Sequence, residues 1–149
     1  MLVLVLPFVP VTSGGVSEET TPEPIGEYAQ SCLGRERVFE YFAQKNQTPT
    51  LIYRLNYAVD FRYGVVMELA KSVLNGKEID LRTENVNVIW QGDANEIALR
   101  SLLHCQAPAK ILNVTGPEIL SIKWIANQFG NIFNKEPKFI YEAEGTALL

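Results

Sequence analysis

The chain has 149 residues, of which 47% are hydrophobic and 20% are charged, a composition typical of a globular domain with a real core. Its 17 acidic residues outnumber its 13 basic ones, so the formal net charge is −4. The sequence has no run of lysine or arginine that could follow a phosphate backbone. The composition therefore disfavours disorder and nucleic-acid binding.

The two cysteines indicate neither a metal site nor a disulfide framework. Cys32 and Cys105 lie far apart, without a CxxC pair or flanking histidines. Two reduced thiols fit a cytoplasmic protein. The apolar segment 1–10 is too short to span a bilayer, is interrupted by Pro7 and Pro10, and lacks the basic start of a secretory signal. We therefore expect a cytoplasmic protein without a membrane segment and without a bound metal.

Hydrophobic periodicity and Gly, Pro and Asn stops predict the secondary structure. In the first half, the expected elements are a strand over 2–9, a loop over 11–25, a helix over 26–45 and a strand over 50–54. In the second half, they are a helix over 65–74, an extended piece over 79–81, a strand over 86–90, a helix from an Asp93 N-cap to about His104, a strand over 111–114, a helix over 121–133 and an extended segment over 138–141. Alternating strands and helices predict an α/β fold with a parallel sheet, formed by one domain over 1–149.

The most informative segment, 23–37, is a proline-bearing loop that leads into a helix with Tyr28 in its first turns. Residues four apart share a helix face, so Cys32 is expected beside the Tyr28 ring. A phenol titrates near pH ~10, so proton transfer near neutrality needs a nearby cation to lower its pKa. A thiol supplies no such charge. Arg35, on the same face, could partly replace it.

Several segments, in this order, resemble a known family. They are the acidic, proline-bearing loop 18–24 with Gly26-Glu27-Tyr28, the strand 51–55 ending in Asn56, the segment 88–94 with Gly92-Asp93 where paired aspartates are usual, and Asn113-Val114-Thr115-Gly116. Together they are similar to the C-terminal part of the NAD-dependent epimerase/dehydratase family, in the extended short-chain dehydrogenase/reductase superfamily. The resemblance covers most of the chain, from about Thr12 to Phe139.

The resemblance implies a partial NAD(P)-binding Rossmann-like parallel sheet with substrate-side helices, and the following roles. Tyr28 is the catalytic tyrosine, Cys32 occupies the position of the catalytic lysine, and Asn56 contacts the substrate. Arg54 and Arg62, which flank Asn56, could each meet a substrate phosphate, although a solvated loop charge is an equal alternative for both. The implied substrate is a sugar nucleotide or a similar small molecule, and the implied cofactor is NAD or NADP.

The sequence departs from the family pattern in three respects. No Gly-rich turn of the required spacing is present, because Gly14-Gly15 is the only close glycine pair. Segment 1–6 offers no hydroxyl for the catalytic serine or threonine, and Thr12 and Ser13 come late for that role. The chain resembles a family member shortened at both ends. We therefore expect no cofactor binding by this chain alone, an impaired or inactive enzyme, and cofactor-binding residues that the sequence does not identify.

Two other functions stay open. The chain could be a non-enzymatic binding module or a homodimerisation module, in which the Tyr28 helix packs against its twin. It could also be a standalone enzyme with an unrelated pocket near Tyr28, Asn56 and Arg54. The remaining aromatic signals, Trp90 and Trp124, are interpreted as core residues.

Overall fold

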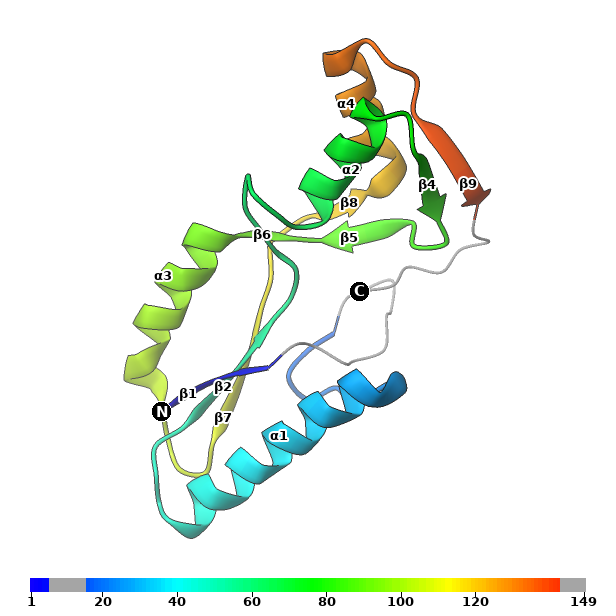
Figure 1. The fold of residues 1–149 in the computed structure, drawn as a ribbon. Helices are drawn as coiled ribbons and strands as arrows, with labels where there is room; N and C mark the ends of the chain where they lie inside the picture. Colours follow the sequence, from blue (N-terminus) through cyan, green and yellow to red (C-terminus); the bar gives the residue numbers. More distant parts are fainter. Residues whose placement is uncertain (6–15, 143–149) are drawn as a thin grey trace. The chain divides into compact units, whose positions relative to one another are not determined.

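The computed structural model describes residues 1–5 and 16–142, and these form two compact units (Figure 1). The first unit combines Met1–Asn56 with Gly92–Thr115, and the second combines Tyr57–Gln91 with Gly116–Leu149. Part of the predicted strand over 2–9 and part of the predicted loop over 11–25, with Thr12, Ser13 and Gly14-Gly15, lie outside the described residues. The single domain predicted over 1–149 stays a prediction.

The first unit is built on a parallel sheet of three strands in the order β1-β2-β7. Its elements are β1 (Leu2–Val5), α1 (Gly26–Lys45), β2 (Leu51–Leu55), α3 (Gln91–Ser101), the 3-10 turn η1 (Leu102–His104) and β7 (Lys110–Val114). Leu51 pairs with Leu2 on one side and with Lys110 on the other. The predicted helix over 26–45 and the predicted α/β class with a parallel sheet are confirmed.

Strand β2 is the central strand and is buried on both of its faces. Leu51, Ile52, Tyr53 and Arg54 are each 3% exposed or less. Successive side chains of a strand point to opposite faces. Ile52 packs against Cys32 of α1, whereas the Tyr53 hydroxyl donates to the Ala94 carbonyl oxygen of α3 at 2.7 Å. Helices α1 and α3 therefore cover opposite faces of this sheet, as the central strand of a doubly covered sheet requires.

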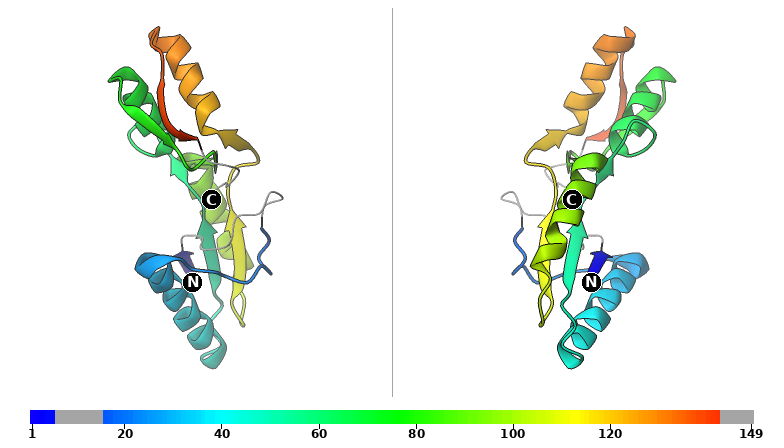
Figure 2. Two further views of the ribbon diagram at one scale, coloured as in Figure 1. Left: turned by 90° about the vertical axis from the view of Figure 1, so that its right-hand side faces the viewer. Right: turned by 90° about the vertical axis from the view of Figure 1, so that its left-hand side faces the viewer.

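The second unit packs two amphipathic helices over short strand pairs. Its elements are β3 (Ala58–Val59), α2 (Val65–Leu74), β4 (Glu78–Leu81), β5 (Asn85–Asn87), β6 (Ile89–Trp90), β8 (Ile119–Ser121), α4 (Ile122–Phe133) and β9 (Lys138–Glu142). The pairs β3-β6 and β4-β9 are parallel, and β5-β8 is antiparallel. Helices α2 and α4 lie side by side in both views of Figure 2. They close an apolar core formed by Leu69, Val73, Ile79, Leu81, Val86, Ile122, Ile125 and Ala126.

The helix boundaries in the second unit follow from local chemistry. Ser121 is the N-cap of α4, and its hydroxyl accepts from the Trp124 N–H at 3.3 Å. Asn134 ends α4 in the left-handed conformation (φ 51°). The predicted elements over 65–74, 79–81, 121–133 and 138–141, and the stop at Asn75-Gly76, are confirmed. Asp93 as N-cap is wrong, because α3 already begins at Gln91 and Asp93 lies in its first turn.

The strand predicted over 86–90 is divided at Val88 into β5 and β6. The backbone of Val88 passes close to Gly116. A Cβ added to Gly116 would lie 1.9 Å from the Val88 carbonyl oxygen. The Asn87 side-chain amide donates to the carbonyl oxygens of Gly116 (2.9 Å) and Glu118 (2.6 Å). A glycine at 116 therefore permits the close approach that breaks the strand.

The prediction that Trp90 and Trp124 are core residues is wrong. Trp124 is 55% exposed, because it lies two positions from Ile122 and Ala126 and so faces away from the side of α4 that these residues bury. Trp90 is 41% exposed, whereas its neighbour Ile89, on the other face of β6, is 6% exposed. The position of each tryptophan on its helix or strand therefore determines its exposure, although the indole ring is hydrophobic.

Replacing Gly116 with alanine should lower the free energy of unfolding by about 1–3 kcal/mol, because the methyl group forces the backbone at Val88 to move. Gly34→Ala is the matched control. Gly34 lies in α1, and a Cβ there meets nothing within 4 Å, so this variant should gain about 0.5–1 kcal/mol. Urea denaturation measures both values, and equal stabilities of the two variants would contradict the account of the strand break.

Candidate active site

The carboxyl edge of the β1-β2-β7 sheet gathers the polar residues of the first unit. Asn56 directly follows β2, and Thr115 directly follows β7. The Asn56 backbone N–H donates to the Val114 carbonyl oxygen at 2.9 Å, and its side-chain amide donates to the Thr115 hydroxyl at 3.4 Å. Helix α1 is the crossover from β1 to β2, so its first turn, with Tyr28, starts from the same edge. In open α/β sheets ligands bind outside this edge.

Tyr28 lies in the first turn of α1, as the sequence predicts, and its side chain is 66% exposed. The helix start is held by local hydrogen bonds. The Ser31 hydroxyl donates to the Tyr28 carbonyl oxygen at 2.7 Å, and the Gln30 side-chain amide donates to the Pro24 carbonyl oxygen at 3.2 Å. The phenol is thus placed on an ordered helix start and reaches solvent. Its catalytic role stays a prediction.

Cys32 lies one turn after Tyr28 in a different environment. Its side chain is 3% exposed and packs against Ile52 of the central strand. The Arg35 guanidinium reaches back along the helix and lies 3.9 Å from the Cys32 sulfur. The sequence placed Cys32 beside the Tyr28 ring, but the structure puts the thiol in the core and the phenol in water. The position that resembles the family's lysine is therefore an interior one in this chain.

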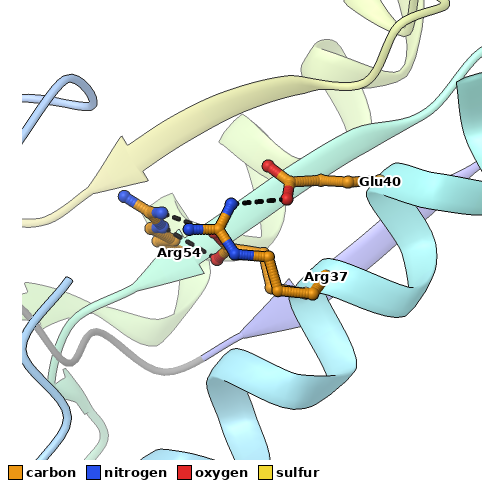
Figure 3. A network of polar contacts seen from close by, with 4 residues as sticks. Arg37, Glu40 and Arg54 are labelled. Carbon is orange, nitrogen blue, oxygen red and sulfur yellow. Dashed lines mark hydrogen bonds and ion pairs between the residues drawn. The ribbon is translucent and has the colours of Figure 1, made fainter. Parts of the chain in front are cut away.

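Arg54 of β2 and Glu36 of α1 form a buried ion pair (Figure 3). The Arg54 Nε donates to Glu36 Oε2 at 2.9 Å, and its Nη2 donates to Glu36 Oε1 at 2.5 Å. The side chains are 2% and 0% exposed. The interpretation of Arg54 as a solvated loop charge is wrong, because the residue belongs to the central strand. Its contact with a substrate stays a prediction, and the pair already engages two of its nitrogens.

Glu36 is a residue that the sequence analysis missed, although a signal for it exists. It follows Cys32 by four positions, so the two share the inward face of α1 together with Ala43. A carboxylate on the apolar face of a helix needs a partner. An arginine inside a strand of buried residues needs one as well. A carboxylate on the apolar face of the helix and an arginine in a buried strand together predict the ion pair.

The outer side of α1 carries a second ion pair next to the buried one. Arg37 Nη1 lies 2.7 Å from Glu40 Oε2, with both side chains partly exposed (Figure 3). The hydrogen bond to Glu40 raises the pKa of Arg37, and the charge of Glu36 adds to this effect. An exposed pair of this kind contributes little to stability.

The described residues were compared with the requirements for a metal site and for a membrane-spanning helix. Over residues 1–5 and 16–142, no three His, Cys, Asp or Glu side chains converge in a way that could hold a metal ion. Of the helices that the structure describes, none has the length and apolar character that crossing a bilayer requires.

The fold is that of about half of an NAD-dependent sugar-nucleotide epimerase or dehydratase. A UDP-glucuronic acid 4-epimerase from Bacillus cereus has a TM-score of 0.80 at 20% identity, over 95% of this chain and 48% of that one. A dTDP-glucose 4,6-dehydratase from Bacillus anthracis has 0.76 at 15% identity, over 98% and 50%. A UDP-glucose 4-epimerase from Thermus thermophilus has 0.71 at 19% identity, over 93% and 50%.

The chain therefore spans about half the length of the solved structures it matches. No protein-family description matches the sequence. No curated protein matches it either. The resemblance to an epimerase/dehydratase fold inferred from the sequence is confirmed at the level of the fold.

Breaking the buried pair on one side should be far more damaging than replacing both partners. Arg54→Met leaves the Glu36 carboxylate buried without its cation and should cost about 3–5 kcal/mol. The double variant Glu36→Leu with Arg54→Met should recover most of this loss, since two apolar side chains of similar size can pack there. Guanidinium denaturation of Arg54→Met, of Glu36→Leu alone and of the double variant completes the double-mutant cycle. Additive losses would show that the two side chains do not act as a pair.

The two thiols should differ in reactivity. Cys105 is partly exposed and Cys32 is buried, so iodoacetamide should label Cys105 in the native protein and label Cys32 only after unfolding. Mass spectrometry after a timed reaction measures the two sites separately, and Cys105→Ser provides the control in which native labelling falls to near zero. Rapid native labelling of Cys32 would contradict its placement in the core.

Proposed function

We propose that this chain is the substrate-side portion of an NAD(P)-dependent epimerase/dehydratase-like oxidoreductase, impaired or inactive by itself. The proposal is carried by one observation: the fold matches about half of several sugar-nucleotide epimerases and dehydratases, with Tyr28 at the start of the crossover helix. The substrate is then a sugar nucleotide or a similar small molecule. A cytoplasmic location belongs to the same proposal.

The residues of this chain fit the substrate side of such a reaction. Tyr28 presents a hydroxyl to solvent at the carboxyl edge of the sheet, where it could exchange a proton with a substrate hydroxyl. Asn56, held by Val114 and Thr115, is the proposed substrate contact at the same edge. The Arg54 side chain is 2% exposed and its guanidinium binds Glu36, so in this proposal its main role is to position β2 against α1.

The residues present do not fit the cofactor in the same way. Several of the solved structures of similar fold are complexes with NAD or NADPH. In this chain the proposed lysine position holds a buried thiol, Cys32, which offers no ammonium to a ribose hydroxyl or to the Tyr28 phenol. The sequence also contains no Gly-rich turn of the required spacing. Groups that hold a dinucleotide must therefore come from the half of the fold that this chain does not span.

Calorimetric titration with NAD and with NADP tests this proposal. The chain alone should show no binding, and the chain joined to the N-terminal half of a similar epimerase should bind. In the joined protein, Tyr28→Phe should lower turnover of a sugar nucleotide by about 10²–10⁴-fold with unchanged cofactor affinity, because only the proton transfer is lost. Tight NAD binding by the isolated chain would refute the account of the missing groups.

A non-enzymatic dimerisation module is the alternative, and the outer face of α1 favours it. Away from its buried face, this helix exposes Val38 (54%), Tyr41 (58%) and Phe42 (47%), and Tyr28 (66%) is exposed at the start of the helix. Tyr41 and Phe42 contact edge to face, with ring centroids 5.2 Å apart. An exposed apolar stripe of this kind is typical of a protein contact surface. A homodimer through α1 would cover it.

If α1 forms a dimer, Val38→Glu should weaken self-association at least about tenfold, because two carboxylates would be buried across a symmetric contact. Sedimentation equilibrium measures the dissociation constant. Lys71→Glu on the exposed side of α2 is the control and should leave it unchanged. A protein that is monomeric at high concentration would rule out this alternative and leave the first proposal intact.

A further inference from the structure

The second unit exposes a group of aromatic side chains that the proposed acid-base site does not use. We name it the aromatic cluster, and its members are Tyr57 (50% exposed), Phe61 (80%), Tyr63 (45%) and Trp90 (41%). Large aromatic side chains are usually covered in a folded protein, because each buries a large apolar area. Four exposed ones on two neighbouring segments indicate a contact surface.

The cluster is built on a tight turn. The Asp60 N–H donates to the Tyr63 carbonyl oxygen at 3.2 Å, and the Tyr63 N–H donates to the Asp60 carbonyl oxygen at 3.3 Å. This places Phe61 and Arg62 at the tip of a two-residue hairpin turn. Gly64 follows with φ +102°, and a Cβ there would lie 3.0 Å from the Val59 side chain. The backbone hydrogen bonds and the glycine at position 64 therefore define the conformation of this turn.

Two contacts hold this turn against Trp90 and Gln91, which belong to the same unit. The rings of Phe61 and Trp90 have centroids 5.1 Å apart and are inclined by 58°, and the two side chains stay 80% and 41% exposed. The Tyr63 hydroxyl donates to the Gln91 side-chain oxygen at 2.8 Å. The arrangement holds two aromatic faces in place while it leaves them accessible to solvent.

A cation lies at the same turn. The Arg62 guanidinium is 80% exposed and is held by Asp60, which accepts from Arg62 Nε at 3.1 Å and from Nη2 at 3.2 Å. The Asp60 carboxylate also accepts from the Arg62 backbone N–H at 3.0 Å. Asp60 thus directs the guanidinium, whose remaining edge can meet an anion outside the protein.

We propose that the aromatic cluster stacks against one ring of a phosphorylated ring compound, with Arg62 contacting the phosphate. A sugar nucleotide has two such rings, the base and the sugar, each linked to phosphate. This proposal rests on the proposed function and adds the site at which the substrate is held. Aromatic side chains stack on any flat ring face, and an adjacent arginine adds charge-assisted hydrogen bonds to phosphate. A neutral sugar or an apolar peptide would leave Arg62 unused.

Tryptophan fluorescence of the whole chain can test this directly. The chain has only two tryptophans, so Trp124→Phe leaves Trp90 as the reporter. UDP-glucose should quench Trp90, and either UMP or glucose 1-phosphate should do so as well, which identifies the base or the sugar as the stacked ring. In the matched Trp90→Phe variant, Trp124, which is 55% exposed, should show no quenching. Pyrophosphate, which has no ring, should leave Trp90 unquenched.

Substitutions then locate the contacts. Phe61→Ala should weaken UDP-glucose binding by about tenfold or more in calorimetry, the usual effect of removing one stacking ring. Since Phe61 is 80% exposed, this change should not alter the denaturation midpoint. Arg62→Gln should weaken binding of the phosphorylated compound and leave binding of the unphosphorylated nucleoside or sugar unchanged. Trp124→Ala is the control for an exposed aromatic elsewhere and should have no effect.

The outcomes separate this site from the proposed function. UDP-glucose binding that Phe61→Ala and Arg62→Gln leave untouched would overturn the site and preserve the function. No binding of UDP-glucose, UMP or glucose 1-phosphate would overturn both. Binding of unphosphorylated glucose as strong as that of UDP-glucose would also overturn the proposal. Self-association that Phe61→Ala abolishes would assign the cluster to a second copy of the chain instead.

Discussion

The buried pair of Glu36 and Arg54 is the constraint on which the geometry of the first unit depends. A charged side chain on a strand that is buried on both faces is unfavourable unless its charge and its hydrogen bonds are matched. Glu36 satisfies this requirement from α1 with two nearly parallel hydrogen bonds, which fixes both the distance and the rotation of the helix over β2. Tyr28 lies eight residues before Glu36, and Asn56 lies two residues after Arg54. The pair therefore sets where the two proposed substrate-facing residues lie.

The same packing explains why the candidate acid-base residue lacks an activating charge. The inward face of α1 carries Cys32, Glu36 and Ala43, and its space against Ile52 is filled by a small thiol. A lysine at position 32 would have to bring an ammonium into this apolar contact or displace the helix, and either is costly without a partner. Arg35 does reach toward the N-terminus of α1, but its guanidinium lies against the Cys32 sulfur. The helix is thus adapted to close packing at the position where the resembling enzymes place a cation.

The regular elements were predictable from sequence, because periodicity and stop signals are local properties. Helices over 65–74 and 121–133 repeat their apolar residues on one face, and both were predicted. Two of the errors come from long-range contacts. The break at Val88 depends on Gly116, 28 residues later, and the burial of Arg54 depends on Glu36, 18 residues earlier. In the candidate site, Tyr28 and Asn56 could be placed because each follows a recognisable boundary. The contact between Trp90 and Phe61 could not be predicted, since it depends on a turn at Asp60 that only the structure reveals.

Ring stacking and proton transfer make different demands on a protein, and this chain meets them unequally. Stacking requires rigid aromatic faces and a cation near the phosphate, which the Asp60 turn provides with contacts inside one unit. Proton transfer by a phenol requires a lowered pKa, hence a charge close to the hydroxyl. The aromatic cluster with Arg62 has the groups that stacking requires. The inward face of α1, in contrast, has a thiol at the position where proton transfer would need a positive charge. Under the proposed function, the isolated chain is therefore expected to hold a substrate without converting it. Binding without turnover would then be the property that distinguishes a substrate-side portion from a module that only dimerises, because dimerisation through α1 needs neither the aromatic cluster nor Arg62.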